Sequence, residues 1–109
     1  MNTIAYRLSA AILLLSVAAW AQAGPKLNGV DPAAGKAGDS CTITGENLGK
    51  DAVNGILVSD DEKDYPAEVV SQATDKIVFK VPSVKPGGYN LSIKVGNNIY
   101  IQPVRFTVQ

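Results

Sequence analysis

The chain has 109 residues, of which 46% are hydrophobic, 18% are charged and 6% are aromatic. Ten Lys and Arg balance ten Asp and Glu, so no net charge draws the molecule to nucleic acid or to an anionic membrane. The chain has no histidine and one cysteine, which excludes His-dependent catalytic triads, histidine or multi-cysteine zinc sites, and an intrachain disulfide framework.

Residues 1–23 are predicted to be a secretory signal peptide. Arg7 gives a positively charged start, 8–20 is apolar except for two serines, and Ala21-Gln22-Ala23 has the small-x-small cleavage pattern. An uncleaved membrane anchor is the alternative, but the apolar run is shorter than the roughly 18 residues of a spanning helix. We therefore expect an exported chain, periplasmic or extracellular, that is cleaved at this pattern and has no transmembrane span in the remainder.

The first half of the remaining sequence alternates short apolar segments with turn signals. In chain order, the segments predicted to be extended are 25–32, 40–45, 56–58 and 67–70. Gly35 and Gly38 supply the backbone freedom for a reversal between the first two segments. An acidic loop, Asp60–Asp64, follows the third segment.

The second half shows a sharper alternation, in which one face of each segment is apolar. The predicted strands are 76–81, 89–95 and 99–108, and Gly96-Asn97-Asn98 is predicted to form a hairpin turn between the last two. Pro103 interrupts the ladder of the last strand, as expected at an edge or a bulge. The residues predicted to face the core are Ile77, Phe79, Val81, Tyr89, Leu91, Ile93, Val95, Val104, Phe106 and Val108.

About seven short strands separated by turns, with no helical period after residue 23, predict an all-β chain. We expect two antiparallel sheets packed face to face over residues 24–109, forming one domain. The Cys–Trp–Cys core of antibody domains is absent, because the chain has one cysteine.

The order of these residues resembles a known family. The run Pro25-x-Leu27-x-x-Val30-x-Pro32-x-x-Gly35-x-x-Gly38-x-x-Cys41-Thr42-Ile43-x-Gly45-x-Asn47-Leu48 resembles the opening of an IPT/TIG domain. The later runs Ile77-x-Phe79-x-Val81-Pro82 and Gly88-Tyr89-x-Leu91-x-Ile93-x-Val95 fit the same family, so that the resemblance covers about 25–108.

The resemblance implies an immunoglobulin-like antiparallel β-sandwich, as in plexins, Rel-type transcription factors and bacterial surface or secreted proteins. It implies a structural or recognition module, with no catalytic residue set and no cofactor. Because this chain is nearly neutral and has no basic stripe, we expect no nucleic-acid partner.

Cys41 is the one thiol, at a position where the family usually has an aliphatic residue. An intermolecular disulfide or a reactive thiol would be its functional roles. The in-phase position of Ile43 instead predicts that Cys41 packs in the core, where a thiol is inert.

Two polar segments have both a functional and an ordinary interpretation. The Asp60–Asp64 loop offers carboxylates to calcium or to glycosidase chemistry, but it lacks EF-hand spacing and contains Lys63, which favours a solvated loop. Asn90-Leu91-Ser92 matches the N-glycosylation sequon and is interpreted as a chance match.

Outward tyrosines are the remaining candidates for contact with a ligand. Tyr65 and Tyr100, the latter beside Gln102, are predicted to face solvent, where they could contact a glycan or a protein partner. Unpaired sheet edges offer a second route to binding. The sequence therefore predicts a non-catalytic exported module for protein interaction or structural support at the cell envelope. Its partner would be a protein or an envelope component. Binding of polysaccharide through the tyrosines is the alternative.

Overall fold

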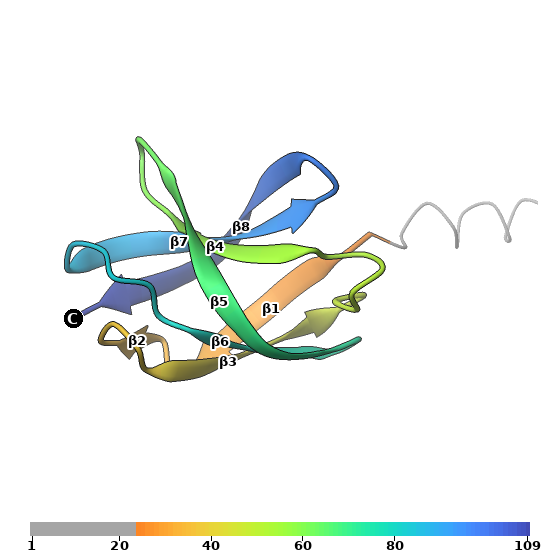
Figure 1. Cartoon of the computed structure of the whole chain (residues 1–109), viewed down its shortest axis with the longest axis horizontal. Helices are drawn as coiled ribbons and strands as arrows, with labels where there is room; N and C mark the ends of the chain where they lie inside the picture. The colour runs from red at the N-terminus through yellow and green to blue at the C-terminus, as the bar shows by residue number, and fades with distance from the viewer. Residues whose placement is uncertain (1–23) are drawn as a thin grey trace, which may run out of the picture.

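Eight β-strands and no helix make up residues 24–109, the part of the chain that the computed structural model describes (Figure 1). The all-β prediction is therefore confirmed, whereas the predicted signal peptide, 1–23, lies outside the described residues. Within the described part, no helix has the length and apolarity needed to cross a membrane. The strands are β1 (Lys26–Asp31), β2 (Ala34–Gly35), β3 (Ser40–Glu46), β4 (Gly55–Ser59), β5 (Asp64–Ala73), β6 (Lys76–Lys80), β7 (Gly87–Val95) and β8 (Asn98–Val108).

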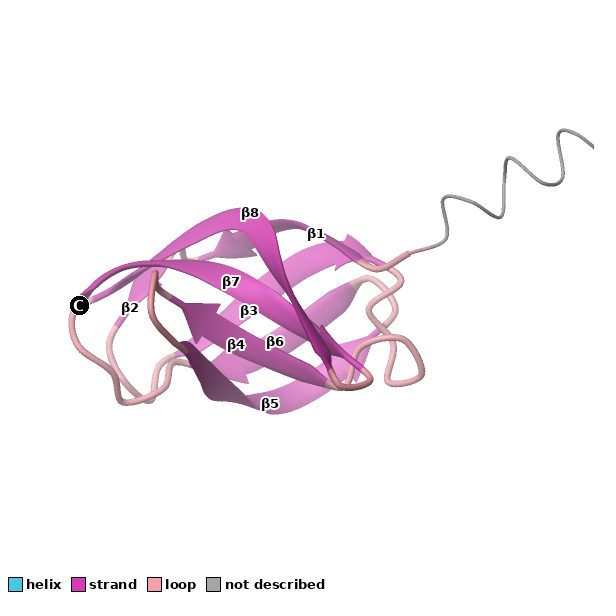
Figure 2. Cartoon of the chain, turned by 90° about the horizontal axis from the view of Figure 1, so that it is seen from above, coloured by secondary structure: helices cyan, strands magenta, loops and turns pink. Residues whose placement is uncertain are grey.

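The strands form two layers that share β5 (Figures 1 and 2). The hydrogen-bonded order is β1-β3-β6-β5-β4-β7-β8-β2. The first sheet contains β1, β3, β6 and the second half of β5, which pairs with β6 from Glu68 onward. The second sheet contains the first half of β5, then β4, β7, β8 and β2. Because β5 passes from one layer to the other, it closes one side of the sandwich.

The predicted strand at 67–70 is too short, because β5 runs from Asp64 to Ala73 and includes Tyr65 and Pro66. Pro66 is tolerated since this half of β5 is an edge, with β4 on one side and no strand of residues 24–109 along the other. A bulge at Val70 then lets the strand bend toward β6. The two-residue strand β2, which pairs in parallel with the end of β8, was not predicted either.

The core lies between the two sheets and is built from the faces that the alternation predicts. Phe79 from the first sheet meets Phe106 from the second in an edge-to-face contact, with ring centroids 5.8 Å apart. Such a contact adds to the free energy of burying the two rings. The buried core residues are Leu27, Cys41, Ile43, Leu48, Val53, Ile56, Val58, Ile77, Phe79, Val81, Tyr89, Leu91, Ile93, Val104, Phe106 and Val108.

Pro103 lies in a bulge of β8, as one of the two sequence interpretations predicts. The pairing jumps from Ile101 opposite Ser92 to Arg105 opposite Asn90, so one residue of β7 faces three of β8. The Asn90 Nδ2 amide donates to the Gln102 carbonyl at 2.9 Å and so satisfies an acceptor inside the bulge.

Candidate functional site

The tip of the β7–β8 hairpin exposes three consecutive large apolar residues, which we call the hairpin strip. Their exposed fractions are 39% for Ile99, 49% for Tyr100 and 62% for Ile101. Figure 1 shows this hairpin projecting beyond the neighbouring strands. An apolar strand end is thus left in solvent.

The two faces of the hairpin strip differ. Tyr100 pairs with Ile93, whose side chain faces the core, so Tyr100 lies on the inward side of the sheet. Ile99 and Ile101 alternate with it and lie on the outer face.

Tyr100 and Gln102 line an open apolar groove of about 320 Å³ together with Pro25, Ile93 and Val95. Gln102 Oε1 accepts a hydrogen bond of 3.1 Å from the Leu27 backbone N–H, which joins β8 to β1. Of the three candidate contact residues predicted from the sequence, the structure thus brings Tyr100 and Gln102 together. The hydrogen bond of Gln102 to β1 holds one wall of the groove in place.

Tyr65 lies at the start of β5 and is not among the residues that line this groove. Its ring is half-buried and stands edge-to-face against Tyr89, with centroids 6.2 Å apart. Desolvation raises the pKa of the Tyr65 hydroxyl, and the charge of Asp60 raises that pKa further. Tyr65 therefore packs on the core from the end opposite to the hairpin turn, separately from Tyr100.

A second, polar hollow of about 210 Å³ lies on the outer face of the second sheet. The Arg105 guanidinium extends over Gly88, where a Cβ would collide with Nη2. Arg105 Nη1 donates to Asn90 Oδ1 at 2.6 Å, so the guanidinium has a fixed position. The hollow is lined by Ser59, Asp60, Asp61, Gly88, Asn90, Ile101 and Arg105.

The acidic loop is organised by its own backbone. Asp60 Oδ1 accepts hydrogen bonds from the N–H groups of Lys63 at 2.7 Å and Glu62 at 2.8 Å, and these bonds lower the pKa of the Asp60 carboxyl. Asp64 Oδ1 accepts from Ser59 Oγ at 2.6 Å, and Ser59 Oγ lies 2.7 Å from Ser92 Oγ. Within 24–109, no three His, Cys, Asp or Glu side chains gather closely enough to hold a metal ion.

The sequon asparagine is engaged at both ends of its amide. Asn90 donates to the Gln102 carbonyl and accepts from Arg105, and Ser92 is fully buried. A glycan is attached through Asn90 Nδ2, which here donates to Gln102 inside the β8 bulge, so attachment would crowd this contact. This supports the interpretation of the sequon as a chance match.

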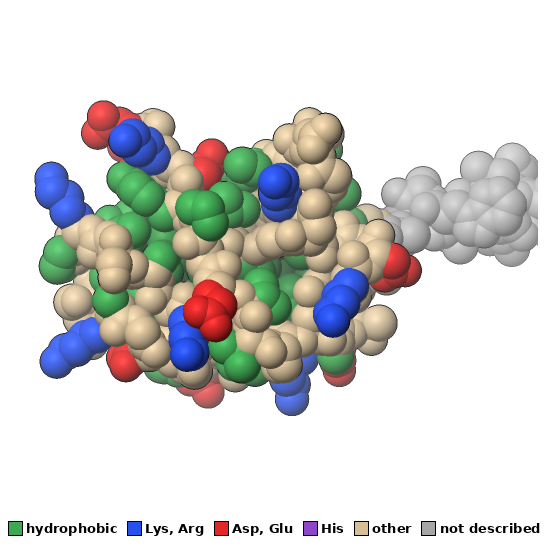
Figure 3. Space-filling view, in the orientation of Figure 1, with side chains coloured by type: hydrophobic (Ala, Val, Ile, Leu, Met, Phe, Trp, Pro, Cys, Tyr) green, Lys and Arg blue, Asp and Glu red, His purple; other side chains and the backbone are tan. Residues whose placement is uncertain are grey.

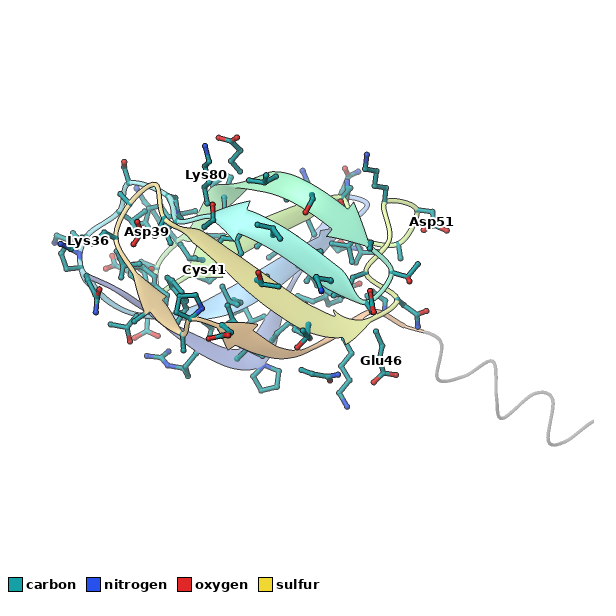
Figure 4. The ribbon with its side chains drawn as sticks, turned by 90° about the horizontal axis from the view of Figure 1, so that it is seen from below. Lys36, Asp39, Cys41, Glu46, Asp51 and Lys80 are labelled. Atoms are coloured by element: carbon teal, nitrogen blue, oxygen red, sulfur yellow. The ribbon has the colours of Figure 1, made fainter. Side chains whose placement is uncertain are left out.

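Cys41 is buried on β3, with 1% of its surface exposed, as the sequence predicts (Figure 4). Desolvation raises the pKa of the thiol, and the negative charges of Asp39 and Asp31 raise it further. The thiolate, which is the reactive form, is therefore scarce in the folded protein.

We expect Cys41 in the native protein to react with a thiol reagent at least about a hundredfold more slowly than in urea, because labelling requires opening of the sheet. The raised pKa also makes stability pH-dependent. The stabilisation that the buried thiol gives the fold is fully present below the pKa of the unfolded thiol. It is lost as the pH rises from there through the pKa of Cys41 in the folded protein. Labelling followed by mass spectrometry at several pH values measures how well the fold protects Cys41. Rapid labelling of the native protein at about pH 8, near the ordinary thiol pKa, would contradict the expected protection.

Comparison with known proteins shows the family to which the sequence belongs. The pattern that defines the IPT/TIG domain matches residues 25–108. The chain belongs to the IPT/TIG domain family. Its immunoglobulin-like sandwich and the eight strands described above agree with this membership.

Relatives of this IPT/TIG domain include a cyclomaltodextrin glucanotransferase of Bacillus sp. (strain 1-1), 35% identical over 88 residues. The match covers 77% of this chain but 12% of that enzyme. A structural genomics protein of unknown function from Bacteroides thetaiotaomicron shares the fold, with a TM-score of 0.69, 17% identity, and coverage of 81% of this chain and 22% of that one. The Gamma-CGTASE of alkalophilic Bacillus clarkii has a TM-score of 0.59, 22% identity, and coverage of 75% of this chain and 12% of that one.

Proposed function

We propose that this IPT/TIG domain is an exported, non-catalytic recognition module of the cell envelope that binds a protein partner or an envelope component. The hairpin strip carries the proposal, because three neighbouring exposed apolar residues lie in a stretch, 98–104, that contains no charged residue. Contiguous apolar surface of this kind marks interaction sites on soluble proteins. Export is supported by the charged start, apolar run and cleavage pattern of residues 1–23.

The available chemistry supports a non-catalytic role. The chain has no histidine, and its one thiol is buried. The glucanotransferase relative is an enzyme, but the match spans 12% of its length, so we infer that the matched part is accessory to its chemistry. On the face shown in Figure 3, Lys and Arg side chains are scattered among Asp and Glu, an arrangement that does not favour a nucleic-acid partner.

Cross-linking and affinity capture of the tagged protein from its native envelope fraction tests the proposal. The variant Ile99→Lys/Ile101→Lys places two charges on the strip, and we expect it to recover at least about tenfold less partner, because each charge would have to be desolvated on binding. Val70→Lys is the matched control, since Val70 is 52% exposed on β5, away from the hairpin. Equal recovery by the wild type and both variants would contradict the proposal.

Carbohydrate binding is the second candidate. It is favoured by the name of the glucanotransferase relative and by the polar hollow on the second sheet. Sugar hydroxyls both donate and accept hydrogen bonds, and the hollow offers acceptors on Asp60 and Asp61 and donors on Arg105 beside the exposed Ile101. Its volume is below the roughly 300 Å³ of a typical ligand pocket, which suits one sugar ring. The groove beside Tyr100 and Gln102, and the separate Tyr65, are the alternative contacts.

Titration calorimetry with a maltodextrin distinguishes these contacts. If the hollow binds sugar, Arg105→Ala lowers the affinity about tenfold, the effect of one lost hydrogen-bonding group, while Tyr100→Ala leaves it unchanged. If the groove binds sugar, the effects of the two variants are reversed. Absence of binding by the wild type would overturn the carbohydrate candidate.

A further inference from the structure

Within 24–109, no strand pairs with the outer edge of β8 over the hairpin strip. Along one side β8 pairs with β7, whereas on the other side β2 pairs only with Thr107 and Val108. Gln102 contacts β1 through its side chain rather than through its backbone. Among the described residues, the edge at 98–101 is therefore open to a further strand.

The hairpin turn determines which backbone groups point outward. Gly96-Asn97 is a two-residue turn with φ +63° at Gly96, so Val95 and Asn98 form the hydrogen-bonded pair that closes it. Hydrogen-bonded and non-hydrogen-bonded pairs alternate along an antiparallel ladder. The N–H and C=O of Ile99 and Ile101 therefore point away from β7, and no strand within 24–109 pairs with them on that side.

The protective features of this edge begin only beyond the strip. The bulge at 102–104, with Pro103 in it, and Arg105 all lie after Ile101, and β2 covers only the last residues of β8. Natural sheets place such features where pairing with another chain must be prevented. Their absence from 98–101 leaves an uncharged segment of high β-propensity free to pair.

We propose that two copies of this chain pair antiparallel through the outer edges of their β8 strands, about a two-fold axis at Tyr100. Ile99 of each copy then faces Ile101 of the other, and each such pair exchanges both backbone hydrogen bonds. Tyr100 faces Tyr100 across the axis as a non-hydrogen-bonded pair. The inference rests on the binding role proposed for the hairpin strip, and it names a second copy as a partner of that strip.

The symmetry of the segment favours a second copy over a foreign strand. Ile99-Tyr100-Ile101 reads the same in both directions, so a two-fold pairing buries the same side chains on both copies. The isoleucines gather on the outer face and the tyrosines on the inward face, next to the groove at Ile93 and Val95. Because 98–104 contains no charge, no like charges meet near the axis.

The dimer is expected to be weak. Pairing over so short a segment buries much less than the roughly 1,200 Å² of a stable interface, which places the dissociation constant in about the micromolar to millimolar range. A covalent trap is therefore the most sensitive test.

Tyr100→Cys provides this trap, in a Cys41→Ala background. The Cα atoms of a non-hydrogen-bonded antiparallel pair lie about 4.5 Å apart, within the range that a disulfide spans. We expect mild oxidation of the purified protein to give a covalent dimer. Ile99→Cys is the matched control and should give at least about tenfold less dimer, because its symmetry mate is two residues out of register. Equal cross-linking of the two variants, or none with Tyr100→Cys, would overturn the proposal.

Sedimentation of the unmodified protein over a range of concentrations gives an independent measurement. We expect the average mass of the wild type to rise with concentration and that of Ile101→Lys to stay at the monomer value. A wild type that remains monomeric while the strip still captures envelope protein would overturn the two-copy inference and leave the proposed function intact. Concentration-dependent pairing without any captured partner would support the two-copy inference and overturn the envelope partner.

Discussion

Phe106→Ala is expected to lower the free energy of unfolding by about 3–5 kcal/mol, far more than a substitution on the surface of the sandwich. Phe106 is 1% exposed and contacts Phe79 of the opposite sheet. Truncation leaves a cavity between two sheets whose strands are held by backbone ladders, so the site collapses only partly. Because small proteins are stable by about 5–15 kcal/mol, the variant should be close to unfolding.

Urea unfolding followed by circular dichroism measures this effect. Ile99→Ala is the control on the same strand, since its side chain is already partly in solvent, and its effect should lie near 0.5 kcal/mol, roughly that of an ordinary surface change. A loss of less than about 1 kcal/mol for Phe106→Ala, well below the usual cost of such a truncation, would mean that the two sheets do not pack through this ring.

Gly45→Ala is expected to lower the free energy of unfolding by about 3 kcal/mol, at the upper end of overpacking effects. A Cβ at this position would collide with the backbone oxygen of Lys26, and it would lie 3.1 Å from both Leu27 Cα and Leu48 Cδ1. Two of these three atoms belong to the backbone of β1, so relief of the collision requires β1 to move away from β3.

Gly29→Ala is the matched control for this position, because Gly29 lies on β1 itself and a Cβ added there would meet no atom within 4 Å. It should be neutral or stabilising by about 0.5 kcal/mol, since alanine restricts the unfolded chain more than glycine does. Urea unfolding and amide exchange at Leu27 distinguish the two variants. Equal stabilities would show that β1 and β3 do not approach as closely as described.

Most of the fold could be predicted because alternation has a physical cause. A strand with one face in the core must place an apolar side chain at every second residue, as 77–81 and 104–108 do. The length of β5 could not be predicted in this way, because Pro66 looks like a strand breaker until its edge position is known. The bulge at Val70 further disrupts the alternation.

The candidate site was only partly predictable, for a similar reason. Tyr100 and Gln102 share a face by simple alternation, and the structure places both on one groove. The exposure of Ile99 and Ile101 depends on whether another part of the protein covers the outer face of the hairpin, which local sequence does not encode. The polar hollow combines Ser59, Gly88 and Arg105 from three strands, so only the tertiary structure brings it together.

The outer edge of β8 is the proposed binding surface, and residue-resolved amide hydrogen exchange tests this role most directly. The Tyr100 N–H points toward β7 and serves as an internal control that should be protected under all conditions. We expect the N–H groups of Ile99 and Ile101 to exchange fast in dilute protein and at least about tenfold more slowly at high concentration or with a captured partner. Unchanged exchange at both isoleucines under every condition would contradict a binding role for this edge.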